Sequence, residues 1–394
     1  MLALLLLAMG GLVSATMLSG DEEETATNSD PEGGADGSDQ AETEFVTLSE
    51  FFESIHVSGT EGTVNGTERA DEIIIDSQPG HPGGHLEDLG FGDLYYDATL
   101  VEIDANDGAD QIIVESGGAI ISTGDGADTV DAHGMDAGVI FAGSGDLVLG
   151  SDIESAGYQG TPQVGVVAHG AVFEGGAAAE FGVALGDGAQ MSGNGGNDIL
   201  HAYEGDAILN GGEGNDTLLG NASPVRFGQD TRVTNVDTMS NSSLDTLIGG
   251  DGDDLLELSR GDLGTGGDGE DIFRVFANDD DLVLNAATIT DFSPSEDSLV
   301  IQVGGGDPWD YHDPSYDLAD RVSYSDDGVT TSVIVDGEIV ANIEGVTELS
   351  IGFPDHSSLS EHGAPVLYVN SETGEIEDIT SFDIIVMVFH SQST

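Results

Sequence analysis

The sequence predicts an all-β protein in which short parallel strands stack as a β-roll or β-helix, closed by a C-terminal β cap. Residues 211–219 read GGEGNDTLL, and the same arrangement of glycines, an aspartate and apolar residues returns at 249–257 and 266–274. Of the 394 residues, 59 are glycine and only 6% are aromatic. This composition favours stacked repeats over a large conventional core.

Two segments at the start of the sequence are expected to lie outside the stacked repeats. Residues 1–20 contain no charged side chain, which is typical of a removed export signal or of a retained membrane anchor, and these two remain alternatives. Residues 21–50 combine many acidic side chains with few large apolar ones, so we expect a disordered linker. In both alternatives the acidic flank lies outside the cytoplasm, and the expected membrane contact is through residues 1–20.

The segment 51–187 repeats in a degenerate form. Its β-branched residues, which suit a buried pleated surface, are spaced nine residues apart: Ile103, Ile112, Ile121, Val130, Val139 and Val148. Asp110, Asp128 and Asp146 each precede one of them by two positions and recur at every second repeat, so alternate turns are expected to stack on one edge. We predict either a degenerate β-roll in which these three aspartates are candidates for calcium binding, with Asp110 and Asp128 as the assigned ligands, or a calcium-poor β-helix.

The segment 188–285 carries the clearest repeats, each a polar turn followed by a short strand. Nearly every repeat aspartate is followed, two positions later, by an apolar residue: Leu200, Ile208, Leu218, Leu247, Leu256 and Phe273, with Gly264 as the exception. Such a residue is buried only when the units stack. Aspartates that are two repeats apart are expected to share an edge, as in the pairs Asp198–Asp216 and Asp254–Asp271. The turns of Asp206, Asp245 and Asp262 have lost most glycines, so we expect less metal there.

The charge of the chain predicts a cationic ligand. There are 76 acidic residues against six basic ones, and the formal net charge is −70. Turns stacked in register bring carboxylates and carbonyl oxygens together, where they repel one another. Ca²⁺ fits best, because it takes about six to eight oxygen ligands flexibly, whereas Mg²⁺ requires a strict octahedron. Zn²⁺ favours nitrogen and sulfur, and the chain has no cysteine. So few basic residues exclude nucleic acid as a partner. Adaptation to high salt is a second hypothesis for the acidity of the chain, and it is compatible with calcium binding.

The repeats resemble those of a known family. GGEGNDTLL, GGDGDDLLE, GGDGEDIFR and the variant GNGGNDILH at 193–201 resemble the GGxGxDxUx nonapeptide of RTX proteins, the hemolysin-type calcium-binding repeat family. The resemblance implies a right-handed parallel β-roll in which the turns hold Ca²⁺ and the last three residues form strand. The calcium ligands that it implies lie in four turns: Gly193, Gly196, Asn197, Asp198, Gly211, Gly212, Gly214, Asn215, Asp216, Gly249, Gly250, Asp251, Gly252, Asp254, Gly266, Gly267, Asp268, Gly269 and Asp271.

The C-terminal part is expected to cap the roll. Residues 286–350 include ATITDFSPSEDSLVI, which resembles the segment that ends many RTX rolls, and a hairpin predicted around Asp336-Gly337. The tail, 351–394, ends in FDIIVMVFHSQST, an acid followed by an apolar run that is similar to the uncleaved signal of type I secretion. An ordinary cap strand is the alternative for this run.

No catalytic motif is present. The sequence lacks HExxH, GxSxG and cysteine, so we expect a non-enzyme. A polysaccharide lyase or epimerase on a β-helix is the alternative, although only six arginines are available to hold an anionic substrate. His81, His85 and the aromatic segment 305–316 are weaker candidates for binding sites. We therefore expect an extracellular or cell-surface adhesin, matrix or surface-layer protein, with calcium ions and candidate partners among cell-surface glycans and other surface proteins.

Overall fold

A computed structural model describes the chain at residues 53–57, 62–76, 84–85, 95–96, 100–153, 164–220, 243–277, 286–304, 321–347, 349–354, 368–370, 376–377 and 384–389. The chain divides into two units, Met1–Val46 and Thr47–Thr394, and every described residue belongs to the second. The expected export signal or anchor, His81 and the segment 305–316 lie outside the described residues. No helix within the described ranges is long and apolar enough to cross a membrane.

Most strands of the second unit belong to two sheets, sheet A and sheet B, and within the repeats the neighbouring strands of each sheet run parallel. Sheet A contains β1 (Glu53–Val57), β3 (Asp71–Asp76), the first part of β8 (Gln111–Ser122), β10 (Thr129–Asp131), β12 (Leu147–Leu149), β14 (Val172–Glu174), β16 (Gln190–Gly195), β18 (Ile208–Glu213), β20 (Thr246–Asp251), β22 (Leu263–Asp268) and β24 (Ala287–Ile289). Sheet B contains β2 (Gly62–Asn65), β6 (Val101–Asp104), the second part of β8, β11 (Met135–Ala142), β13 (Val164–His169), β15 (Glu180–Leu185), β17 (Ile199–Glu204), β19 (Thr217–Gly220), β21 (Leu255–Leu258), β23 (Ile272–Ala277) and β25 (Ser298–Gly304).

The remaining strands form the C-terminal part and two small sheets. The C-terminal strands are β26 (Val322–Asp326), β27 (Thr330–Val335), β28 (Glu338–Glu344), β29 (Ile351–Pro354), β30 (Tyr368–Asn370), β31 (Ile376–Glu377) and β32 (Ile384–Phe389). The small sheets pair β4 (Gly84–His85) with β5 (Tyr95–Tyr96), and β7 (Asp107–Gly108) with β9 (Asp125–Gly126).

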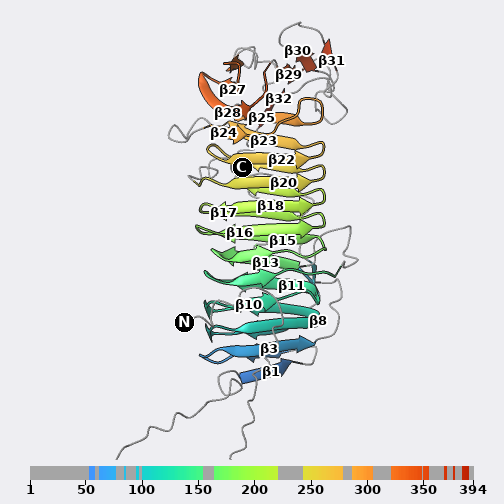
Figure 1. The fold of residues 1–394 in the computed structure, drawn as a ribbon, viewed down its shortest axis with the longest axis vertical. Coiled ribbons are helices and arrows are strands. Elements are labelled where there is room, and N and C mark those ends of the chain that lie inside the picture. The colour runs from blue at the N-terminus through green and yellow to red at the C-terminus, as the bar shows by residue number, and fades with distance from the viewer. Residues whose placement is uncertain are drawn as a thin grey trace, which may run out of the picture. The chain divides into compact units, whose positions relative to one another are not determined.

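Consecutive coils stack in sequence order, alternating between the two sheets (Figure 1). Ile199 pairs with Thr217, so one coil takes two repeats, as the repeat spacing predicts. Thr246 pairs with Leu263, so the coil between them is shorter by a single residue. Ile208 pairs with Thr246, so the additional residues of that longer coil leave the register of the strands intact. The predicted fold class, an all-β parallel roll or helix, is confirmed.

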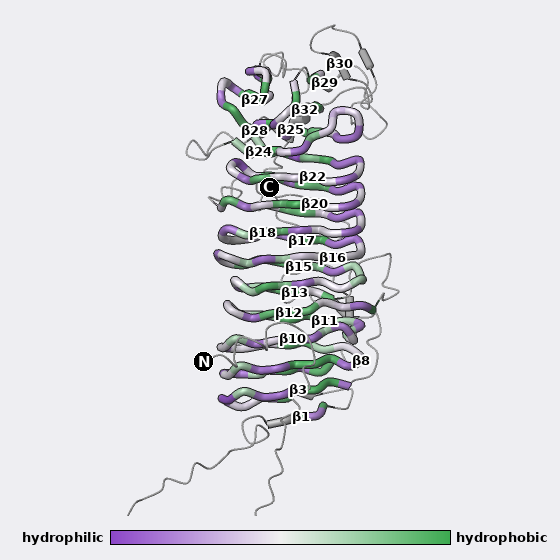
Figure 2. Tube along the Cα trace, in the orientation of Figure 1, coloured by the Kyte–Doolittle hydropathy of each residue, from purple (hydrophilic) through white to green (hydrophobic). Residues whose placement is uncertain are grey.

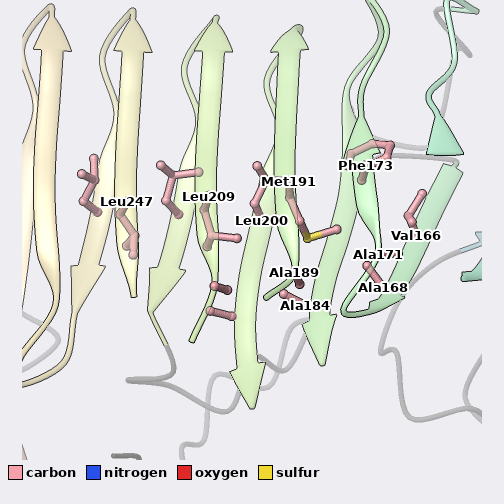
Figure 3. Close-up of a cluster of buried hydrophobic side chains, with 14 of the residues drawn as sticks. Val166, Ala168, Ala171, Phe173, Ala184, Ala189, Met191, Leu200, Leu209 and Leu247 are labelled. Atoms are coloured by element: carbon pink, nitrogen blue, oxygen red, sulfur yellow. The ribbon is translucent and has the colours of Figure 1, made fainter. Parts of the chain in front are cut away.

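The core is two rows of inward side chains, one from each sheet, because alternate residues of a strand point to opposite faces. The turns are mostly hydrophilic and the strands carry the hydrophobic residues (Figure 2). Figure 3 shows part of the interior, where the large side chains form one band across the strands and alanines lie beside it, nearer one edge. The sheet A row is Ile73, Ile112, Val130, Val148, Phe173, Met191, Leu209 and Leu247, and the sheet B row is Ile103, Ile121, Ile140, Val166, Leu200, Leu218, Leu256 and Phe273, all at most 3% exposed.

Two predicted core positions are shifted by one residue. Val139 is buried, but Ile140 pairs with Ile121 in the inner row, because an irregularity between Met135 and Ala137 shifts the register. Val139 consequently belongs to a second cluster on the opposite face of sheet B. A local shift in strand pairing thus moves the inward-facing position by one residue, although the nine-residue spacing of the sequence is unchanged.

The second shift lies in the turn of Asp206. The prediction of Ile208 as a core residue is wrong, since it is 46% exposed and Leu209 is fully buried in its place. Ile208 pairs with Thr246 of the next coil, so Ala207, and not Asp206, aligns with Asp245. Asp206 therefore stands one residue ahead of the aligned aspartates.

The C-terminal part contains the predicted hairpin, β27 and β28, which follows β26, and the parallel coils continue before it through β24 and β25. Asp336 and Gly337 both have positive φ, 51° and 89°, as a tight hairpin turn with two such residues requires. A bulge beside Val333 turns Ile339 outward, at 44% exposure, and Val340 inward. Strand β28 pairs with β24, which places the hairpin on the last coil. The apolar run of the tail forms β32, parallel to β25; its use as a secretion signal stays a prediction.

Candidate metal centre

The predicted aspartates lie in two stacks at opposite edges of the roll. We call the turns that lead into sheet A edge A, and those that lead into sheet B edge B. The N-terminal stack, at edge A, consists of Asp110 and Asp128. The C-terminal stack, at edge B, consists of Asp198, Asp216, Asp254 and Asp271. Both expected pairs, Asp198–Asp216 and Asp254–Asp271, are neighbours in this stack.

One carboxylate oxygen of each aspartate ties two coils together. Oδ1 of Asp216 accepts a hydrogen bond from the backbone N–H of Asp198 at 2.8 Å, and Oδ1 of Asp254 accepts one from Asp216 at 2.7 Å. The same bond links Asp271 to Asp254 at 3.0 Å, and in the N-terminal stack it links Asp128 to Asp110 at 2.7 Å. Each aspartate thus accepts from the N–H of the equivalent residue one coil earlier.

The second oxygen has no such partner. Within the described part of the chain, the aspartates whose buried Oδ2 lacks any hydrogen-bond partner are Asp110, Asp128, Asp198, Asp216, Asp254 and Asp271. Each of these side chains is at most 3% exposed. A buried polar atom without a partner is costly, and native proteins rarely keep one without a reason such as an ion. All six are among the aspartates predicted as ligands from the sequence, a set that also includes Asp251 and Asp268.

Backbone carbonyl oxygens lie beside these carboxylates. A Cβ atom built on Gly211 would collide with Oδ2 of Asp216 and lie 2.6 Å from the carbonyl oxygen of Gly249, in the next coil. A Cβ on Gly193 would meet Asp198 and the Gly211 carbonyl in the same way, again at 2.6 Å from the carbonyl oxygen. The first glycine of the repeat is therefore required by close approach. Without its side chain, a carboxylate oxygen and a carbonyl oxygen from the next coil share one small space.

The fourth residue of the repeat is glycine for a different reason. Gly214 has a φ of 138°, which side-chain-bearing residues rarely adopt, and a Cβ there would overlap the carbonyl oxygen of Gly196 one coil earlier. The glycines thus bring the main chains of successive coils into contact at the turn.

Burial disfavours the charge of these carboxylates. Burial, with a smaller contribution from the nearby Glu180 and Asp216 carboxylates, raises the pKa of Asp198 from 3.8 to about 8. Burial also raises the pKa of Asp110, Asp128, Asp254 and Asp271 to about 6. The pKa of Asp216 is raised for the same reason. A bound cation would reverse this trend, because it favours the charged carboxylate.

The other predicted side-chain ligands are exposed, unlike the orphaned carboxylates. Asn197 and Asn215 form a separate outer row, in which Asn197 Oδ1 accepts from the N–H of Asn215 at 3.1 Å and Asn215 Oδ1 from Asp253 at 3.2 Å. Asp251 and Asp268 are paired in register but exposed. Among the predicted side-chain ligands, the buried ones are thus the orphaned aspartates.

Sequence reasoning missed a second class of buried carboxylate, in which both oxygens are satisfied by the protein. We call these closed carboxylates. Asp146 Oδ2 accepts from Thr123 Oγ1 and from the N–H of Gly143, both at 2.7 Å. Glu180 accepts from the N–H groups of Ser151 and Gly176. The others are Asp71, Asp245, Asp262 and Asp297. The repeat pattern already identifies Asp146, Asp245 and Asp262, but it does not reveal the donors that satisfy them.

Across the described residues, no three His, Cys, Asp or Glu side chains converge on one point. A cation at either stack would therefore take roughly one carboxylate from each coil and complete its shell with carbonyl oxygens, as Ca²⁺ does readily. No protein-family model matches the chain, and no curated protein is similar enough to be a relative.

Proposed function

We propose that this protein is an exported, calcium-binding repeat protein of the RTX type whose roll folds when Ca²⁺ binds. The observation that carries the proposal is the set of orphaned Oδ2 atoms in the two stacks. In the C-terminal stack such an atom lies beside a carbonyl oxygen of the next coil, as at Asp216 and Gly249. A hard divalent cation satisfies both oxygens at once, and it neutralises charges that the roll otherwise buries unpaired.

The charge of the chain supports the same proposal. A formal net charge of −70 opposes compaction, and each Ca²⁺ offsets two negative charges at the place where the carboxylates are most crowded. A ligand that binds only the folded form, present at about 100 times its dissociation constant, adds roughly 2.7 kcal/mol of stability per site. Several such sites add up to the stability of an ordinary domain, about 5–15 kcal/mol.

The place of action follows from this dependence. Free Ca²⁺ is low inside cells, so the chain stays largely unfolded and competent for export there; outside, millimolar Ca²⁺ completes the fold. We propose that the folded protein acts as an adhesin, matrix or surface-layer component, with cell-surface glycans or other surface proteins as its partners. Glycan-array binding in calcium separates an adhesin from a passive coat: specific glycan binding supports the first, and none supports the second.

Removal of calcium tests the proposal. In excess chelator we expect most of the β-sheet circular dichroism signal to be lost, because the stacked carboxylates repel one another, and we expect Ca²⁺ to restore it. Mg²⁺ at the same concentration is the matched control, and it should restore little because its octahedral shell keeps water. A spectrum that is identical in chelator and in calcium would contradict the proposal.

A further inference from the structure

The two stacks are separated by coils in which no described residue is an orphaned carboxylate. Strands β11 to β15 lie between Asp128, the last member of the N-terminal stack, and Asp198, the first member of the C-terminal stack. Their buried carboxylates in the described ranges are Asp146 and Glu180, which are both closed. At edge A of the next coil, Val172 pairs with Leu147, so Ala171 stands at the position of Asp146 and no carboxylate is present there. No cation is therefore required to hold these coils together.

Donors from several turns satisfy the two closed carboxylates. Asp146 Oδ1 accepts from the N–H of Asp128 at 2.9 Å, so the last member of the N-terminal stack is itself held by a closed carboxylate. Glu180 Oε1 accepts from the N–H of Ser151 at 2.6 Å, and the backbone N–H of Glu180 donates to Asp198 Oδ1 at 2.7 Å. The longer side chain of Glu180 thus reaches backbone N–H donors, whereas Oδ2 of Asp198, one coil later, has no donor.

A second, independent feature marks the same strands. Val139, Val167, Phe181 and Val183, on β11, β13 and β15, form a hydrophobic cluster on the outer face of sheet B and are each at most 5% exposed. Sheet B is therefore buried on both faces in these coils. In the C-terminal stack the outer row aligned with Phe181 is more open, since Ile272 is 41% exposed, whereas the row aligned with Val183 stays buried but turns polar at His201 and Glu257.

The inner face of these coils is also well filled. Phe173 and Met191, among the largest fully buried side chains, lie next to each other in the sheet A row (Figure 3). The Met191 side chain occupies the space opposite Gly182, where a Cβ would lie 2.6 Å from Met191 Cε. The hydrophobic core thus continues through the coils that contain no orphaned carboxylate.

We infer that β11 to β15 form a metal-independent nucleus, from which calcium extends the fold in both directions. This inference rests on the proposed function, because it assumes that the two stacks need Ca²⁺. It adds that loss of calcium opens the roll from the stacks and leaves the nucleus folded. The chain in low calcium is then a folded centre flanked by open arms, rather than a uniformly unfolded polymer.

Hydrogen exchange of the full chain, followed by mass spectrometry of its peptides, tests this inference. In excess chelator we expect peptides within 137–149 and 164–185 to keep protection at least ~100-fold above that of peptides within 246–274. In millimolar Ca²⁺ both sets should be protected. If all peptides lose protection together in chelator and regain it in calcium, the nucleus is wrong while the proposed function stands. If all stay protected in chelator and calcium changes nothing, both are wrong.

A matched pair of variants separates the nucleus from the stacks. Phe181→Ser removes an outer-face side chain of the nucleus and is expected to abolish the protection of 164–185 in chelator, while Ile272→Ser, at the aligned position of β23, leaves it unchanged. Neither residue is a proposed ligand. If Phe181→Ser leaves that protection intact, the outer cluster does not hold the nucleus and the inference is contradicted.

Discussion

Replacement of Asp198 and Asp216 by asparagine is expected to change stability in opposite directions with and without calcium. The amide keeps the Oδ1 acceptor that the N–H groups of Glu180 and Asp198 use, at 2.7 and 2.8 Å. Its NH₂ group replaces the orphaned Oδ2 and faces the carbonyl oxygens of Gly211 and Gly249, to which it can donate. In chelator the double variant therefore loses buried charge and gains donors, so its urea midpoint should rise.

In calcium the same variant should be less stable than the parent. An amide nitrogen cannot ligate Ca²⁺, so a fall in affinity of ~100-fold at each affected position costs roughly 2.7 kcal/mol. The comparison is best made near pH ~8.5, where the pKa of Asp198, about 8, leaves its carboxylate mostly charged.

Asp262→Asn is the matched control for this prediction. Asp262 Oδ2 accepts a hydrogen bond from the backbone N–H of Ser259 at 2.7 Å. In the asparagine variant an NH₂ group would replace this oxygen and face the N–H of Ser259, so neither group could accept. This variant should be destabilised in chelator and in calcium alike. A double variant at Asp198 and Asp216 that behaves like Asp262→Asn would show that the orphaned oxygens are not metal ligands.

The metal-free protein is expected to become more stable as the pH falls from about 8 to about 5. The folded-state pKa of Asp198 is about 8, and the values for Asp110, Asp128, Asp254 and Asp271 are about 6, all above the ordinary 3.8. A raised folded pKa means that the folded chain binds protons more tightly than the unfolded chain does. The associated stability is present at low pH and is lost as the pH rises through about 6 to 8.

Calcium should reverse this dependence, because its ligands must be deprotonated and protons compete with it. Urea midpoints of the metal-free and calcium-loaded protein at pH ~5 and ~8 check both slopes. Relief of general charge repulsion also favours acid, so the variant with Asp198→Asn and Asp216→Asn is the control, and its metal-free slope should be smaller. A metal-free protein that loses stability on acidification from pH ~8 to ~5 would contradict the buried-carboxylate account.

The fold could be predicted largely from the sequence, because each nonapeptide couples a turn to an apolar residue at a fixed offset. Leu200, Leu218, Leu256 and Phe273 are fully buried, as that offset predicts. The prediction for Ile208 failed because Asp206 is one residue out of register with the other aspartates. The spacing alone does not reveal which of two adjacent residues aligns with the next coil.

The candidate site could be predicted only in part. The aspartates of the GGxGxD turns are buried in stacks, but the sequence does not distinguish an open carboxylate from a closed one. Asp146 sits in a glycine turn much like that of Asp128, yet Thr123, one coil away, donates to its Oδ2. Glu180 lies one coil before Asp198, in a turn that keeps the first two glycines of the repeat, Gly175 and Gly176, but has glutamate in place of the aspartate. These differences arise from donors in neighbouring coils, which become visible only when the strands are paired.

The most direct test of the central claim is the anomalous scattering of calcium in crystals of the protein grown in millimolar Ca²⁺. The account predicts density beside the Oδ2 atoms of the two stacks, Asp110, Asp128, Asp198, Asp216, Asp254 and Asp271, and none beside the closed carboxylates. An ordered roll with no density at those oxygens, or with density at exposed surface carboxylates alone, would contradict it.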